Sequence, residues 1–349
     1  MFIRWCKRFG LGVLGLVTLL LTAGALYQSI ESKLEEKRYP PLGEMVDVGG
    51  YKLHMYSMGE GGPVVILDTG LGCPSPAWAM VQPGIAKFTR VISYDRAGNG
   101  WSEPSPFPRT SAQIVKELKT LLETAEVPKP YILVGHSFGG NNVQLYAATY
   151  PDDVAGLVLV DSCHEDQERR LPPNPIDLQA KILHSPQGSY LISTFGIIRF
   201  FLHATLETRR ILMPNFPTNA LNTYVALCSK ANHIQTTAAE ATLLPISFDQ
   251  LKQADQSRLK EKPCIVLTAG NLIDISAYGI PREKLSYMRR MFAVWHDLQK
   301  DLAHKFKKVR QIITNQSDHM IPFKDPELII DSVRTLVKNQ KFLPEQEGS

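Results

Sequence analysis

A short apolar run leads directly into a serine flanked by glycines, in residues 131–139 (YILVGHSFG). The pattern G-x-S-x-G at the exit of a strand predicts a turn so tight that the positions two residues before and after the serine must be nearly free of side chains. Residues 140–148 (GNNVQLYAA) then predict a helix. A strand, a tight turn and a helix in this order favour a nucleophile elbow over an ordinary glycine-rich turn, with the Ser137 oxygen held above a sheet edge.

Short apolar runs alternate with helical patterns along most of the chain, which predicts an α/β fold. The runs lack polar alternation, which is typical of parallel strands covered on both faces. The candidate strands are Tyr51–Tyr56, Val64–Leu67, Val91–Tyr94, Tyr131–Val134, Leu157–Val160, Ile265–Leu267 and Val309–Ile313. Thr110 and Gln113 fit a capping box at the start of one helix, and Asp325-Pro326 predicts the start of another.

Composition narrows the function classes. Of 349 residues, 44% are apolar and 21% are charged, which indicates a folded globular body. The net charge of +4 includes no basic block, so we expect no nucleic-acid partner. The five cysteines are scattered without a C-x-x-C pair, and His164-Glu165-Asp166 has no second histidine cluster beside it. We therefore expect no metal site, no disulfide framework and no cofactor.

The first thirty residues differ from the rest of the chain. Arg4, Lys7 and Arg8 precede an uncharged stretch from Phe9 to Ile30. As a helix this stretch would rise about 33 Å, enough to cross the hydrocarbon core of a bilayer. The positive flank predicts a single-pass membrane protein whose main body lies outside the cytoplasm. The alternative is a signal peptide cleaved near residues 23–25 (AGA), which leaves a secreted or periplasmic protein.

Five segments follow from these patterns. We expect a membrane anchor or signal segment (1–30), a solvated linker (31–41), the first part of an α/β core (42–162), an inserted helical cap (163–262) and the second part of the core (263–342). The cap is predicted because a hundred residues are too many for a simple connection between two strands. Its aromatic side chains either line a substrate pocket or pack the cap onto the core; they include Phe195, Phe200, Phe201 and Phe216.

A serine nucleophile needs a base, and the best candidate is His319. It lies in residues 315–322 (NQSDHMIP), between the last predicted strand and the last helix. Loops at the carboxyl edge of an open α/β sheet are where functional groups converge. His136 is next to Ser137 in the chain, and its side chain should therefore point away from the serine oxygen.

A third group must orient the imidazole, and two aspartates compete for this role. Asp161 directly follows the strand Leu157–Val160, whereas Asp274 follows the strand Ile265–Leu267 after several more residues. Both give the chain order serine, acid, histidine. Placement at a strand end favours Asp161, with Asp274 as the alternative.

Acyl transfer also needs donors directed at the developing oxyanion. One candidate is the backbone N–H of Phe138, directly after the serine. The other is the backbone N–H of Leu71, in the loop of residues 68–73 (DTGLGC) after the strand Val64–Leu67. The glycines of this loop allow a close backbone approach.

With these motifs in order, residues 40–342 resemble the α/β-hydrolase superfamily, especially its membrane-anchored or exported bacterial members. The matching segments are 91–102 (VISYDRAGNGWS), the GHSFGG elbow, 156–162 (GLVLVDS) and the loop 317–319 (SDH) followed by Pro326-Glu327. The resemblance implies an eight-stranded, mostly parallel sheet and a triad of Ser137, an acid and His319. It also implies a structural role for Asp95 and Arg96.

The sequence departs from the family pattern at two places. Thr69-Gly70 stands where many members have His-Gly in the oxyanion loop. The usual acid position after the penultimate strand is Ile273, which adds weight to Asp161 over Asp274.

The leading hypothesis is a serine hydrolase that cleaves a carboxylic ester, with a thioester or an amide as alternatives, through an acyl-enzyme. Its partner would be a small-molecule acyl substrate, and the N-terminal helix would attach it to a membrane. The alternative is a non-catalytic exported binding or envelope protein on a hydrolase fold.

Overall fold

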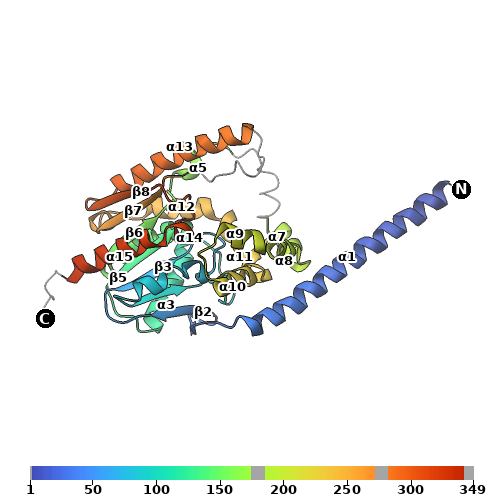
Figure 1. Ribbon diagram of the computed structural model, residues 1–349, viewed down its shortest axis with the longest axis horizontal. Coiled ribbons are helices and arrows are strands. Elements are labelled where there is room, and N and C mark those ends of the chain that lie inside the picture. Colours follow the sequence, from blue (N-terminus) through green and yellow to red (C-terminus); the bar gives the residue numbers. More distant parts are fainter. Residues whose placement is uncertain (1, 174–184, 272–281, 342–349) are drawn as a thin grey trace.

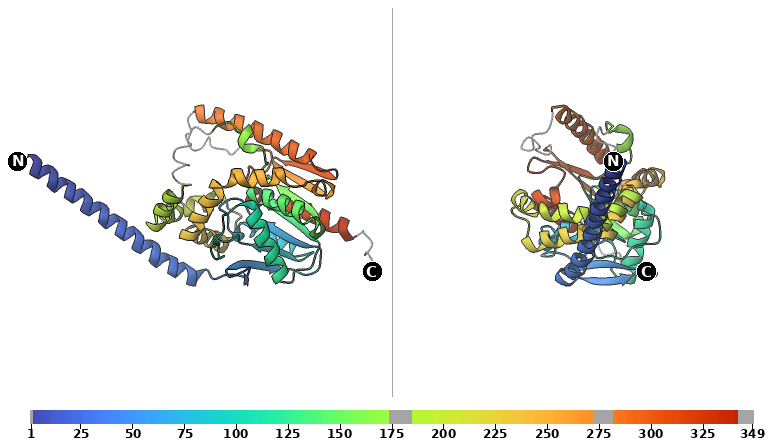
Figure 2. Two further views of the ribbon diagram at one scale, coloured as in Figure 1. Left: turned by 180° about the vertical axis from the view of Figure 1, so that it is seen from behind. Right: turned by 90° about the vertical axis from the view of Figure 1, so that its right-hand side faces the viewer.

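The computed structural model describes residues 2–173, 185–271 and 282–341. Figure 1 shows a layered body of sheet and helices, with one long helix, α1 (Phe2–Arg38), that extends away from it. The two further views in Figure 2 show the same arrangement from behind and from the end.

The body is built on one eight-stranded sheet with the strand order β1-β2-β4-β3-β5-β6-β7-β8. β2 pairs antiparallel with β1 and β4, and the other neighbours are parallel, which confirms the predicted mostly parallel sheet. The strands are β1 (Glu44–Asp47), β2 (Lys52–Met58), β3 (Val64–Asp68), β4 (Val91–Tyr94), β5 (Tyr131–His136), β6 (Val154–Val160), β7 (Cys264–Ala269) and β8 (Val309–Thr314). Every strand except β1 overlaps a run predicted from the sequence.

Both faces of the sheet are covered, and β3 shows how. Val64 and Ile66 belong to a buried cluster with residues of α3 (Ser111–Thr124), α4 (Phe138–Thr149) and α13 (Arg282–His304). Val65 and Leu67 point to the other face, into a cluster with α2 (Gln82–Ile85) and α15 (Pro326–Lys341). This alternation explains why the strand sequences are apolar without interruption.

Between β6 and β7, the described residues form helices, turns and loops. The helices are α5 (Gln167–Arg170), α7 (Pro186–Thr194), α8 (Ile197–Ala204), α9 (Leu206–Leu212), α10 (Thr218–Cys228), α11 (Ala231–Thr242) and α12 (Leu244–Gln253). The last of these, α12, packs on α3 and α4 and so belongs to the layer that covers the sheet. The short helices η1 (Ser75–Trp78), η2 (Pro151–Asp153), η3 (Leu259–Glu261) and α14 (Ile321–Lys324) complete the body.

The start of α3 corrects one prediction. Thr110 is the residue before the helix, but its side chain makes no capping hydrogen bond, and Gln113 donates to Glu117 instead. Side chains of α12 accept from the first N–H groups: Ser247 Oγ lies 3.0 Å from the nitrogen of Ser111, and Gln250 Oε1 binds the next one at 2.8 Å. The predicted helix α3 is present, but side chains of α12, rather than that of Thr110, accept hydrogen bonds from its first N–H groups.

Within the segment 31–41, which was expected to be a solvated linker, α1 continues to Arg38; most of these residues are exposed, and Glu35 is buried. Gln28 and Glu35 are buried against the helices between β6 and β7. Within the described residues, the stretch Arg4–Arg38 is the one helix that is long and apolar enough to cross a membrane.

Candidate active site

Ser137 lies in the tight turn between β5 and α4. Its φ of +53° is a left-handed conformation that residues other than glycine rarely adopt. A Cβ at Gly135 would lie 2.5 Å from the Gly139 carbonyl oxygen, and a Cβ at Gly139 would lie 2.4 Å from that of Asp68. The turn is therefore as tight as the G-x-S-x-G pattern predicts, and both glycines are required by close backbone approach.

His319 and Asp161 meet Ser137 at the carboxyl edge of the sheet. His319, in the loop between β8 and α14, has Nε2 3.0 Å from Ser137 Oγ and Nδ1 2.6 Å from Asp161 Oδ2. With the proton on Nδ1, His319 donates to Asp161 and accepts from the serine hydroxyl. Three residues far apart in the sequence thus form one continuous hydrogen-bonded path.

Asp161 is held rigidly at the end of β6. Its Oδ1 accepts from the backbone N–H of Ala269 at 3.0 Å, and its Oδ2 also accepts from Trp295 Nε1 at 3.0 Å. Burial alone would raise the pKa of Asp161, but its hydrogen bonds and the electrostatic attraction of His319 outweigh this effect, so the pKa lies below its ordinary value. The carboxylate is therefore ionised and available to orient the imidazole.

Two neighbours of His319 were not predicted as parts of the site. The ring of Trp295, on α13, meets the His319 ring edge to face at 5.6 Å in addition to binding Asp161. The ring of His136 lies beside the ring of His319, with centroids 4.9 Å apart, and its Nε2 donates to the His319 carbonyl oxygen at 2.8 Å. Burial, and then the neighbouring His319, lower the pKa of His136 to about 3, so His136 is neutral and fixes the His319 backbone.

A cavity of about 350 Å³ opens at Ser137. Most of its wall is apolar, and much of that wall comes from α13, which follows β7. The lining residues are Leu71, Ser137, Phe138, Asp161, Cys163, Gln167, Leu171, Leu244, Ala269, Asn271, Met288, Met291, Phe292, Trp295 and His319. Leu71 and Phe138, the expected oxyanion donors, thus border the same cavity as the serine.

The pocket interpretation of the cap phenylalanines is wrong. Phe200 and Phe201 are exposed, and Phe216 packs against Phe323 with ring centroids 5.1 Å apart. None of the four, Phe195 included, is among the residues that line the cavity. The helices between β6 and β7 place these rings on other surfaces, and α13 supplies the apolar wall.

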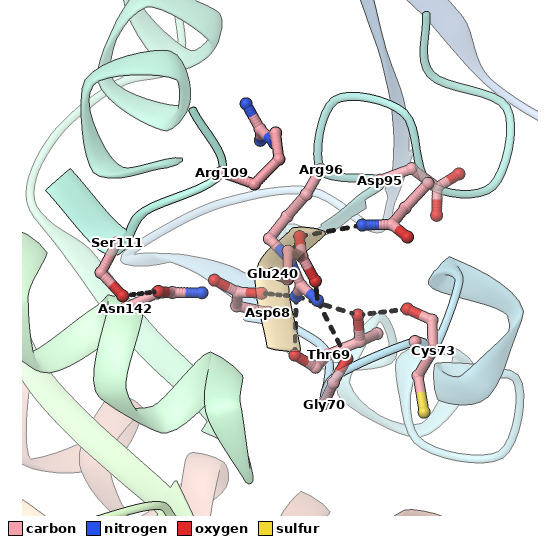
Figure 3. A network of polar contacts seen from close by, with 12 residues as sticks. Asp68, Thr69, Gly70, Cys73, Asp95, Arg96, Arg109, Ser111, Asn142 and Glu240 are labelled. Atoms are coloured by element: carbon pink, nitrogen blue, oxygen red, sulfur yellow. Dashed lines mark hydrogen bonds and ion pairs between the residues drawn. The ribbon is translucent and has the colours of Figure 1, made fainter. Parts of the chain in front are cut away.

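The loop of residues 69–73 is held by a buried ionic network around Arg96 (Figure 3). One guanidinium nitrogen donates to Asp68 at 2.7 Å and to the Thr69 carbonyl at 2.8 Å, and the other donates to the Gly70 carbonyl at 3.0 Å. Glu240 of α11 completes the network with two contacts of 2.8 and 2.9 Å to Arg96. The loop that contains Leu71 is therefore held from two sides, by Arg96 after β4 and, through Arg96, by Glu240 of α11.

Helices α10 and α11 also contact this loop directly. His233 Nε2 donates to the Gly72 carbonyl at 3.1 Å, while its Nδ1 accepts from the backbone N–H of Gly100. Tyr224 OH contacts Cys73 Sγ at 3.3 Å. Burial lowers the pKa of His233 to about 4, so this contact is made by a neutral imidazole.

Asp274, the alternative acid, lies outside the described residues. Among the residues that the structure describes, no group of three or more His, Cys, Asp or Glu side chains is arranged to hold a metal ion. The polar groups that are hydrogen-bonded to one another at the cavity are the Ser137 hydroxyl, the His319 imidazole and the Asp161 carboxylate. Such a set suits proton transfer and nucleophilic attack.

Comparisons with known proteins agree with this architecture. Residues 62–190 match the family model described as alpha/beta hydrolase fold. A relative from Gibberella zeae named "AB hydrolase superfamily protein" is 25% identical over 290 residues, covering 79% of this chain and 86% of that protein. A thermophilic esterase from Thermogutta terrifontis has a TM-score of 0.56 and 19% identity, and the match covers 85% of this chain and 98% of that chain. At this identity the likeness shows the shared fold.

Another relative is a longer protein. "Probable transporter efuK" from Hormonema carpetanum is 22% identical over 315 residues. The match covers 84% of this chain and 42% of that protein. The chain thus spans less than half the length of this relative.

Proposed function

Since this chain belongs to the α/β-hydrolase superfamily, we propose that it is a serine hydrolase that acts through an acyl-enzyme, on a carboxylic ester in the first instance and otherwise on a thioester or an amide. One observation carries the proposal: the hydrogen-bonded path from Ser137 through His319 to Asp161, with contacts of 3.0 and 2.6 Å. This is the arrangement in which an imidazole can remove a serine proton and be stabilised while it carries the charge.

The chemical steps follow from these contacts. Ser137 Oγ attacks the carbonyl carbon as its proton passes to His319 Nε2, and the carbonyl electron pair moves onto the oxygen. The imidazolium, held by Asp161, then gives the proton to the leaving group as the bond to the carbonyl carbon breaks. Water then attacks the acyl carbon as it gives a proton to His319 Nε2. His319 returns this proton to Ser137 Oγ as the acyl bond breaks, which releases the acid and restores Ser137.

The oxyanion would be bound by the backbone N–H groups of Phe138 and Leu71. Phe138 is the first residue of α4, so its N–H has no acceptor within the helix. Leu71 lies in the loop that Arg96 and Glu240 hold beside the cavity. The apolar wall formed by Met288, Met291 and Phe292 favours a substrate with an apolar acyl group.

The N-terminal helix makes the protein a single-pass membrane protein in this proposal. The basic residues Arg4, Lys7 and Arg8 would keep its start in the cytoplasm and place the catalytic body on the other side. The exposure of the apolar part of α1 supports its insertion in a membrane, because a bilayer core would bury an apolar surface that is otherwise exposed to water.

The decisive experiment is labelling with a fluorophosphonate, which reacts with an activated serine. We expect stoichiometric labelling of the native protein in detergent and none after Ser137→Ala, with the adduct on the peptide that contains Ser137. A folded protein that remains unlabelled would instead favour the non-catalytic binding or envelope protein.

A further inference from the structure

Helices α7 and α8 carry an exposed apolar surface. Tyr190 is 58% exposed, Phe200 61% and Phe201 60%, and Leu191 and Ile197 of the same two contacting helices are exposed as well. Positions 197, 200 and 201 have the spacing that places side chains on one face of a helix. We call these five residues the α7–α8 surface. Several large apolar side chains exposed together mark a contact surface rather than ordinary solvent-facing structure.

The other side of α8 is fixed to α1. Arg199 is fully buried, and its guanidinium donates to Gln28 Oε1 at 2.8 Å and to Ser32 Oγ at 2.9 Å, and forms an ion pair with Glu35. A Cβ at Gly24 would lie 2.5 Å from the carbonyl oxygen of Phe195, so α1 also touches the turn between α7 and α8. These contacts fix the position of the α7–α8 surface along the axis of α1.

The position of this contact along α1 coincides with the expected boundary of the hydrocarbon core. If the hydrocarbon core of about 30 Å begins at Phe9, a rise of about 1.5 Å per residue brings its far boundary close to Gln28. The contact at Gly24 then lies about 6 Å inside this boundary. Helices that lie in the membrane interface bury their apolar face about 5–10 Å into it.

From this geometry we propose that the α7–α8 surface is inserted in the boundary of the same bilayer that α1 crosses. The occupant of the surface is lipid, because α7 and α8 adjoin α1 at the contact between Gly24 and Phe195, and the apolar part of α1 is itself exposed. In Figures 1 and 2, α7 and α8 lie at the end of the body from which α1 extends. The hydrolase body thus rests on the membrane instead of moving freely at the end of a tether.

Contact of the α7–α8 surface with the bilayer also indicates a substrate class. This inference about the substrate rests on the proposed function. The beginning of α13 lies at the same end of the body as α7 and α8 in both figures, and α13 supplies Met288, Met291 and Phe292 to the cavity. In this proposal an apolar acyl chain enters the cavity from the bilayer along the apolar side chains of α13. The substrate is therefore an acyl ester of an amphiphile that resides in the membrane.

A quenching experiment tests the insertion without reference to catalysis. The full chain is placed in phospholipid vesicles that contain lipids brominated near the top of the acyl chains. Phe200→Trp introduces a reporter in the α7–α8 surface, and Val309→Trp introduces one at the exposed start of β8. After subtraction of the unsubstituted protein, we expect strong quenching at position 200 and none at 309. Equal quenching at both positions, or none at 200, overturns the proposal.

Kinetics on two esters test the substrate class. The double variant Phe200→Ser/Phe201→Ser should lose about tenfold or more in kcat/KM on a fluorogenic ester held in the bilayer, because apolar surface is removed from the interface. The double variant should keep its activity on a water-soluble short-chain ester. The control Ile313→Ser, which changes an exposed apolar residue on β8, should keep its activity on both esters. Loss on neither ester, or equal loss on both, contradicts the inference. Absence of hydrolysis by the unsubstituted protein would contradict the proposed function but leave the quenching result standing.

Discussion

The two sides of the reactive centre are built in different ways. Ser137, Asp161 and His319 follow the carboxyl ends of β5, β6 and β8, so the sheet itself sets the distances between them. The loop of residues 69–73 opposite them depends on buried charges, and Glu240 of α11 completes its support through Arg96.

This difference separates two kinds of dependence. The reacting groups need only the strand order and the turns, which the core provides. The loop that would bind the oxyanion needs a side chain 144 residues away from Arg96, supplied by the helices between β6 and β7. A change in those helices can therefore alter catalysis without moving the serine, the histidine or the aspartate.

The largest loss of activity is expected for a change among Ser137, Asp161 and His319, which we call the strand-end side of the site. Asp161→Asn should lower kcat on a short-chain ester by about 10⁴-fold, the loss seen when a triad carboxylate becomes an amide and the histidine tautomer is wrong. Asp274→Asn, measured beside it, should remain within a few-fold of the unsubstituted protein. The reverse pattern would assign the role of the acid to Asp274.

A smaller loss of activity is expected for a change that affects the loop of residues 69–73, which we call the loop side of the site. Glu240→Gln leaves Arg96 buried with only one carboxylate partner, which should lower the free energy of unfolding by about 3 kcal/mol. Displacement of the loop should reduce kcat by about 10- to 100-fold with little change in KM. Glu207→Gln, which breaks the exposed pair with Arg210, is the matched control and should alter stability by less than about 0.5 kcal/mol.

Trp295 sharpens the comparison, because it supports the strand-end side through a side chain from α13. Trp295→Phe removes the indole donor to Asp161 but keeps an aromatic ring. One hydrogen bond to a charged group corresponds to about a tenfold loss in kcat. Phe292→Leu, which changes the same cavity wall without touching Asp161, should alter KM more than kcat. An unchanged kcat in Trp295→Phe would show that the Ala269 amide and His319 suffice to hold the carboxylate.

The mildest effect concerns acid stability at the loop. The pKa of His233 is about 4 in the folded protein and near 6.5 in an unfolded chain, so the unfolded state takes up a proton first as the pH falls. The stability that His233 contributes is complete above about pH 6.5 and declines below it. Between pH 7 and 5.5 the unsubstituted protein should lose about 1 kcal/mol more than His233→Gln in urea unfolding. Equal losses would mean that His233 is not held neutral against Gly72.

Much of the strand-end side could be predicted from the sequence. The glycines around Ser137, the apolar strand that ends at Asp161 and the loop position of His319 are local patterns with a direct structural meaning. They predict the sheet and the chain order of the three residues. The resemblance implies a structural role for Arg96 but not its partner Glu240. Glu240 and Trp295 carry no such local signal, because their contacts are determined only when distant helices pack together.

The wrong predictions have the same origin. Thr110 has the sequence of a cap, but Ser247 and Gln250 take its place from another helix. The charged segment after Ile30 has the composition of a linker, yet α1 continues through it to Arg38, and buried Arg199 contacts Ser32 and Glu35 there. Local composition predicts what a segment can do alone, and tertiary contacts then decide between the possibilities.

The most direct test of the central claim is to trap the intermediate. The protein is mixed with a p-nitrophenyl ester, quenched with acid during turnover and analysed by mass spectrometry of the intact chain and of its peptides. The account predicts an added acyl mass on the peptide that contains Ser137, with release of about one equivalent of p-nitrophenol before the steady state. Acylation of another residue, or turnover that persists after Ser137→Ala, would contradict it.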